Sequence, residues 1–117
     1  MMAILGKGDL VTSVNLPNRG QISNLPLGVV VETNAAFTAD SVKPIMAGAM
    51  PDSLYGLTAP IVAVQSLTVQ AGLARSLELG FQAFMADPHV QSLSFTDAKA
   101  LYEEMIAGTA EYLKDYK

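Results

Sequence analysis

The segment that decides the fold lies at residues 14–26 and reads Val-Asn-Leu-Pro-Asn-Arg-Gly-Gln-Ile-Ser-Asn-Leu-Pro. It is dense in amides and turn residues, whereas charged residues make up only 15% of the chain. Pro17 fixes its own φ and Gly20 can adopt a positive φ, so residues 17–20 are predicted to form a turn. A second turn signal follows at residues 27–28, which places the amides in a loop between two extended segments.

Three polar side chains of this segment, Asn15, Asn18 and Arg19, are the candidate substrate-binding residues. Two asparagines and an arginine on adjoining positions offer several directed hydrogen bonds, including a bidentate fork for a carboxylate. The alternative is that Asn15 and Asn18 bond the backbone of their own turn. The residues alone leave both interpretations open.

The first 50 residues are predicted to form strands and loops. β-branched and apolar residues favour strands at residues 10–16, 29–33, 35–38 and 42–46. The run that begins at Val29 is β-branched and is expected to be buried on both faces up to Glu32. Pro44 has no N–H for a ladder, so the last strand is expected at a sheet edge. Before the strands, Ala3–Gly8 is typical of the last turn of a helix with a glycine C-cap.

A change of period at Pro51 predicts that the second half is helical. Apolar residues three or four apart indicate one helical face: Leu54, Leu57, Ile61, Val64, Leu67 and Ala71. Pro51 suits a first helical turn, whereas Pro60 is expected to kink the helix or to make it restart near Thr58.

Two further helices complete the prediction. The first is expected at residues 76–86 and to end at Asp87-Pro88. Residues 96–97, Thr-Asp, are expected to cap the last helix, which Gly108 divides. A β-rich half followed by packed helices is the α+β class.

Composition narrows the function. At 117 residues the chain, residues 1–117, is predicted to be one domain. Half of its residues are hydrophobic, and this apolar excess favours a homo-oligomer or a separate partner chain. A net charge of −4 with seven scattered basic residues argues against nucleic acid and anionic membranes. Breaker or charged residues interrupt the apolar runs, so no membrane span is expected.

The absence of cysteine excludes disulfides, thiol nucleophiles and cysteine-containing metal sites. His89 is the single histidine, and beside Asp87 it makes an incomplete metal site and an incomplete triad. Glu103 and Glu104 diverge on a helix, which indicates a solvated face. Gly6-Lys7-Gly8 lacks the spacing of a phosphate loop. Without a signal peptide, the cytoplasm is the expected compartment.

At residues 14–26 the sequence resembles the start of the C-terminal domain of the family 4 glycoside hydrolases. Further matching pieces follow in the same order along nearly the whole chain: residues 30–32, Pro44-Ile45, Gly48, Pro51, 67–71, 82–88, 101–105 and 111–113. Asn-Arg-Gly at residues 18–20 and Thr33-Asn34 are most similar to members that act on α-linked uronic acids, the α-galacturonidase and α-glucuronidase group.

This resemblance implies an architecture like that of lactate and malate dehydrogenases, with an upstream Rossmann domain that binds NAD. The family's chemistry uses NAD to oxidise C3 and a divalent metal, usually manganese, to acidify C2 before elimination. The residues that hold these groups belong upstream, so no catalytic, cofactor-binding or metal-binding role passes to a residue of this chain.

The favoured hypothesis is a C-terminal substrate-side and oligomerisation domain that is not catalytic alone. It is either a truncated reading frame or half of a split enzyme that needs a separate Rossmann chain. The alternative is a stand-alone module that binds a sugar acid through Asn15, Asn18 and Arg19, or serves as an oligomeric scaffold. An independent enzyme built on His89 and Asp87 has the least support.

Overall fold

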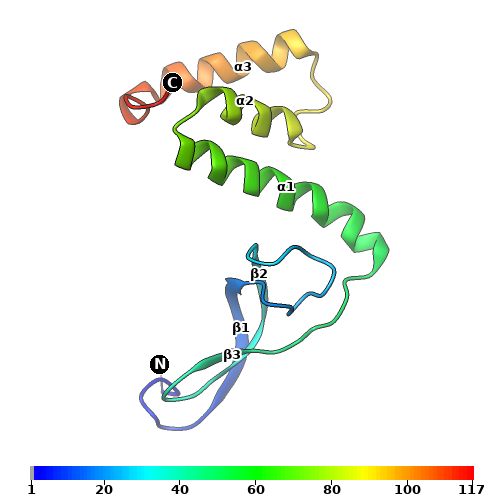
Figure 1. The fold of residues 1–117 in the computed structure, drawn as a ribbon, viewed down its shortest axis with the longest axis vertical. Coiled ribbons are helices and arrows are strands. Elements are labelled where there is room, and N and C mark those ends of the chain that lie inside the picture. The colour runs from blue at the N-terminus through cyan, green and yellow to red at the C-terminus, as the bar shows by residue number, and fades with distance from the viewer. Residues whose placement is uncertain (1) are drawn as a thin grey trace. The chain divides into compact units, whose positions relative to one another are not determined.

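The computed structural model describes residues 2–117. They divide into two compact units, Met1–Tyr55 and Gly56–Lys117. The first unit holds the strands and the start of the first helix, and the second unit holds the rest of the helices (Figure 1). An antiparallel sheet followed by three α-helices confirms the predicted α+β class.

The sheet of the first unit has the strand order β1-β2-β3, with β1 at Leu10–Pro17, β2 at Val30–Phe37 and β3 at Val42–Pro44. Both pairs are antiparallel, and Thr38 N–H closes the second hairpin on the carbonyl of Ser41 (2.9 Å). Because β3 is an edge strand, the place predicted for its proline is confirmed.

Burial along β2 alternates, which corrects the prediction of a strand buried on both faces. Val31 and Ala35 are 5% and 0% exposed, whereas Val30 is 60% exposed. In an antiparallel sheet successive side chains point to opposite faces, and within this unit only one face is covered. β-branched residues on the other face therefore remain open in spite of their hydrophobicity.

Three helices form the second half: α1 at Asp52–Ala74, α2 at Leu77–Ala86 and α3 at Phe95–Gly108, followed by the 3₁₀ turn η1 at Ala110–Tyr112. Ser76 caps α2 by accepting a hydrogen bond from Leu79 N–H, and Asp87 ends that helix as predicted.

The start of α3 differs from the prediction by two residues. Ser94 is the N-cap: its hydroxyl accepts from Asp97 N–H (3.1 Å) and donates to the Asp97 carboxylate (2.7 Å). A serine with an acidic residue three positions later satisfies an end donor in the manner of a capping box. Thr96 therefore lies inside the helix instead of capping it.

The predicted restart near Thr58 is wrong, because α1 is one continuous helix that contains Pro60. Proline removes one hydrogen bond, to the carbonyl of Gly56, and both residues are exposed so that water can solvate this carbonyl. The uninterrupted helix also corrects the expectation about membranes. By length and composition alone α1 could cross a bilayer, a test that core helices of soluble proteins also pass.

Two chain segments have the backbone conformation of a helix C-terminus. Lys7 N–H donates to the carbonyl of Met2 (2.9 Å) and Gly6 N–H to that of Ala3 (3.0 Å), which is the Schellman pattern predicted for a helix C-terminus. Gly6 has the required positive φ of 70°. At the end of α1 the same left-handed position is held by Arg75, with φ 51°.

Candidate functional site

Asn18 is the centre of the loop between β1 and β2, and it is only 1% exposed. Its amide nitrogen donates to three carbonyls, those of Ile22 (3.0 Å), Leu25 (3.0 Å) and Pro26 (3.1 Å). Its amide oxygen accepts from the backbone N–H groups of Gly20 (3.1 Å) and Ile22 (3.2 Å). All of these partners lie in its own loop, so the Asn18 side chain holds the loop together.

Gln21 and Asn24 extend this amide framework. The Gln21 side chain is 0% exposed, donates to the carbonyl of Pro17 (3.1 Å) and accepts from Arg19 N–H. Asn24 pairs with both backbone groups of Met50, as a donor to its carbonyl (2.9 Å) and an acceptor from its N–H (2.8 Å). Buried polar groups need partners, and these three amides supply partners to backbone that no ladder satisfies.

Arg19 has a different environment, because its side chain is exposed at a small recess. The recess has a volume of about 120 Å³ and is lined by Leu16, Pro17, Arg19, Val42 and Pro44. Among residues 2–117 the Arg19 guanidinium forms no ion pair. It therefore keeps its fork of donors available for a carboxylate.

Asn15 points away from this recess. It pairs with Glu32 across the β1–β2 ladder, whereas Leu16, beside the recess, pairs with Val31 on the other face. The three predicted residues therefore do not converge: Asn18 is inside the loop, Arg19 is at the recess, and Asn15 is on the opposite face of the sheet.

One face of the sheet is polar, which the sequence analysis did not predict. Register places five polar side chains on one face, which we call the polar sheet face: Ser13, Asn15, Glu32, Asn34 and Lys43. The signal was the period-two spacing of polar residues within each strand, at 13 and 15 and again at 32 and 34. Amides, a hydroxyl and both charge signs in one layer are groups that hydrogen-bond readily with sugar hydroxyls.

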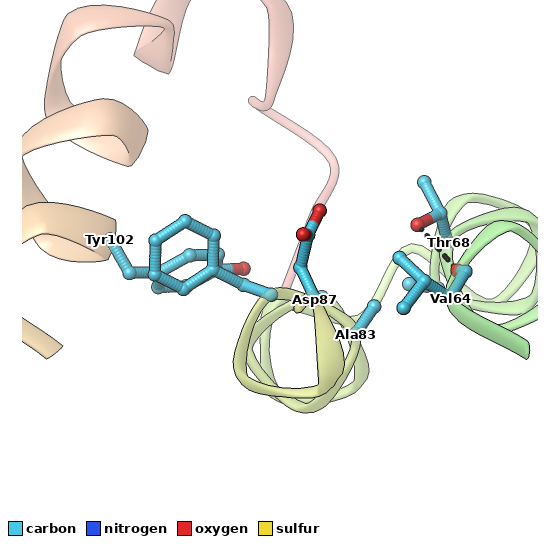
Figure 2. A pocket seen from close by; sticks show the side chains of 8 residues that line it. Val64, Thr68, Ala83, Asp87 and Tyr102 are labelled. Carbon is cyan, nitrogen blue, oxygen red and sulfur yellow. Dashed lines mark hydrogen bonds between the residues drawn. The ribbon is translucent and has the colours of Figure 1, made fainter. Parts of the chain in front are cut away.

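The second unit contains a larger pocket of about 300 Å³. Figure 2 shows Val64 and Thr68 on one side and Tyr102 on the other, with Ala83 and Asp87 between them. The Tyr102 hydroxyl donates to the carbonyl of Leu77 (2.8 Å), and burial raises the pKa of this phenol. The pocket was not predicted, although a glycine inside α2, Gly80, was a signal that something approaches the helix closely.

Asp87 and His89 form a local turn at the surface. His89 N–H donates to Asp87 Oδ1 (2.8 Å), and the His89 Nδ1 lies 2.9 Å from the same oxygen. The backbone N–H first, and then the imidazole, lower the pKa of Asp87. The His89 side chain is 89% exposed, so the pair is a helix stop with a surface histidine.

Within residues 2–117 no three His, Asp or Glu side chains gather as metal ligands. The described residues therefore offer no ligand cluster for the manganese that the resemblance implies.

Residues 1–90 match the family described as Family 4 glycosyl hydrolase C-terminal domain. The chain belongs to this family. Over 116 residues it is 47% identical to an alpha-galacturonidase of Thermoanaerobacter italicus, covering 99% of this chain and 26% of that protein. The recognition of a family 4 C-terminal domain from residues 14–26 is thereby confirmed.

Solved family 4 structures have the same fold. A 6-phospho-alpha-glucosidase from gut microorganisms, in complex with NAD and glucose-6-phosphate, matches with a TM-score of 0.87 and 28% identity over 98% of this chain and 26% of its own. A Thermotoga maritima 6-phospho-beta glucosidase with manganese, NAD+ and glucose-6-phosphate gives 0.82 and 26% over 94% of this chain and 27% of its own. The chain thus spans about a quarter of the relatives that it matches.

Proposed function

We propose that residues 1–117 act as the substrate-side and oligomer-forming domain of an NAD- and manganese-dependent α-glycosidase whose substrate is an α-linked uronic acid. The observation that carries this proposal is the 47% identity to an alpha-galacturonidase over 99% of the chain. On this proposal the domain works in the cytoplasm with a Rossmann domain, on the same polypeptide or on a separate chain, and is not catalytic alone.

The exposed guanidinium supports the uronic acid assignment. A uronate carries a carboxylate where a neutral sugar has a hydroxymethyl group, and an arginine with a free fork of donors favours the carboxylate. Arg19 is the residue of this chain with that property, because the other two candidates are neutral amides. The recess of about 120 Å³ beside it holds a substituent of the sugar and not the whole ring.

The apolar surface supports the need for a partner. Leu57 and Leu73 on α1 are 74% and 83% exposed, and Leu27 in the loop is 77% exposed. Covering such side chains stabilises a complex by about 25 cal/mol for each Å² of apolar area that leaves water. We assign this surface to contacts with the remainder of the enzyme, which also accounts for an apolar α1 without a membrane.

A graft tests the proposal. The C-terminal quarter of the T. italicus alpha-galacturonidase is replaced by this chain, and NAD- and manganese-dependent cleavage of an α-galacturonide is measured. An active graft is expected, with KM raised at least tenfold by Arg19→Ala and less by Arg19→Lys. A folded graft that binds NAD but cleaves no uronide contradicts the proposal.

The alternative of a stand-alone module that binds a sugar acid is tested on the 117 residues alone. If this alternative is correct, calorimetric titration with galacturonate gives heat that Arg19→Ala removes. If the domain functions only with its catalytic partner, the titration gives no heat.

A further inference from the structure

One buried hydroxyl of the sheet has no hydrogen-bond partner. Thr33 on β2 is 8% exposed, and its Oγ1 is bonded to no group among residues 2–117. Asn18 and Gln21, the other buried polar side chains of this part of the chain, are bonded to backbone. A buried donor without a partner costs free energy and calls for an explanation. Because residues of this chain itself bury the hydroxyl, its lack of a partner does not arise from an uncovered surface.

Thr33 lies on the face of the sheet that carries the recess beside Arg19. Leu16 on β1 pairs with the β2 residue two positions before Thr33, and Pro44 on β3 pairs with the β2 residue two positions after it. Both Leu16 and Pro44 line the recess. Paired side chains share a face of the sheet, and diagonal neighbours lie within reach of each other. Two walls of the recess therefore stand on either side of Thr33, and the Thr33 side chain lies at its base.

The two donors at this recess suit one carboxylate. A carboxylate that accepts two hydrogen bonds from a guanidinium fork still has lone pairs for a further donor. A hydroxyl at a buried position is a strong donor to such an anion, because little water competes for it. In the free chain the Thr33 hydroxyl is closed to solvent, so contact requires a shift of the side chains over it. Arg19, which lines the recess, forms no ion pair among residues 2–117 that would resist this shift.

We infer that Thr33 is a second specificity-determining residue, whose hydroxyl donates a hydrogen bond to the uronate carboxylate that Arg19 binds. The inference rests on the proposed function and deepens it, because it adds a donor at the base of the recess to the one at its rim. A hydrogen bond to a charged acceptor is stronger than one to a neutral acceptor. The Thr33 hydroxyl therefore favours a uronate over the neutral sugar with a hydroxymethyl group.

The test is Thr33→Val, which should have opposite effects on stability and on substrate binding. In the 117-residue chain it replaces an unpartnered hydroxyl by a methyl group, so the thermal midpoint should rise by a few degrees. In the graft with the T. italicus enzyme it should raise KM for an α-galacturonide about tenfold, with kcat nearly unchanged. Thr33→Ser keeps the hydroxyl and should keep KM close to that of the unmodified graft. Thr12→Val is the matched control, because Thr12 is an exposed threonine on the same face of the sheet and should change neither quantity.

Three results overturn the inference. A lower thermal midpoint of the Thr33→Val chain means that the hydroxyl serves the fold. A lower midpoint of the substrate-free graft with an unchanged KM means that the remainder of the enzyme supplies the partner. A higher midpoint with an unchanged KM means that the hydroxyl has no ligand. An active graft that does not respond at residue 33 leaves the proposed function intact, whereas a folded graft that binds NAD but cleaves no uronide refutes the proposed function and the inference together.

Discussion

The effect of Gly80→Ala on the free energy of unfolding should change sign when the Tyr102 hydroxyl is removed. Gly80 lies in α2, and a Cβ built there would be 2.5 Å from the Tyr102 hydroxyl and 3.6 Å from the ring carbon that carries it. The first distance is a clash, whereas the second is ordinary contact. The effect of Gly80→Ala should therefore depend on the hydroxyl and not on the ring.

The magnitude follows from three contributions. Alanine is favoured over glycine inside a helix by about 1 kcal/mol. Against this, displacing the hydroxyl breaks its 2.8 Å hydrogen bond to Leu77, which costs about 1 kcal/mol, and overpacking costs about 1–3 kcal/mol. Gly80→Ala should thus lower the free energy of unfolding by about 1–3 kcal/mol. In a Tyr102→Phe background the same change should raise it by up to about 1 kcal/mol.

Hydrogen exchange of the α2 amides measures the effect of Gly80→Ala with and without Tyr102→Phe. It reports on the second unit even if the two units unfold separately. Gly72→Ala is the matched control: this helical glycine also faces a tyrosine hydroxyl, that of Tyr116, but at 3.9 Å. It should be tolerated. If Gly80→Ala costs the same with and without the Tyr102 hydroxyl, the reasoning about this contact is refuted.

Three further predictions concern the loop and the helix ends. Asn18→Ala should lower the stability of the first unit by about 2–4 kcal/mol in urea unfolding, because it leaves buried carbonyls without donors; a neutral result would show that water replaces the amide. Arg75→Gly should be about 1 kcal/mol more stable than Arg75→Ala, because only glycine adopts φ near 51° without cost, and equal stabilities would contradict this. Asp87 should titrate below its ordinary pKa in carboxyl NMR spectra even in His89→Ala, because the backbone N–H is the main cause; its stabilising effect is present above the ordinary pKa and is lost as the pH falls through the folded value.

The sequence predicted the elements better than their surroundings. The positions of β1 and of the α2 end follow from local chemistry, such as the stop at Asp87-Pro88, and these predictions hold. The strands predicted at 29–33 and 35–38, however, form the single strand β2. The burial of Val30 could not be read locally, because hydrophobicity does not say whether the rest of the molecule covers a given face. The restart predicted at Pro60 does not occur for a related reason: the cost of the proline is small where water solvates the freed carbonyl.

The candidate site shows the same limit. The residue types at 15, 18 and 19 were correct for hydrogen bonding, but their directions depend on a loop fold that local spacing does not specify. Asn18 turned inward because the carbonyls of Ile22, Leu25 and Pro26 converge on it. The pocket at Tyr102 brings together residues of three helices. The contact between residues 80 and 102 could be predicted from the sequence only through the glycine inside α2.

The placement of Asn18 changes what the motif at residues 14–26 means. Asn18 makes five hydrogen bonds within its own loop, so it stabilises this loop independently of any ligand. The chain is similar in sequence to an alpha-galacturonidase and in fold to a 6-phospho-alpha-glucosidase, so similarity to the family does not by itself identify the sugar. On the proposed function, specificity depends on positions that the loop presents but does not use. We propose Arg19 as such a position, because its backbone N–H is bound to Gln21 while its exposed guanidinium forms no ion pair among residues 2–117.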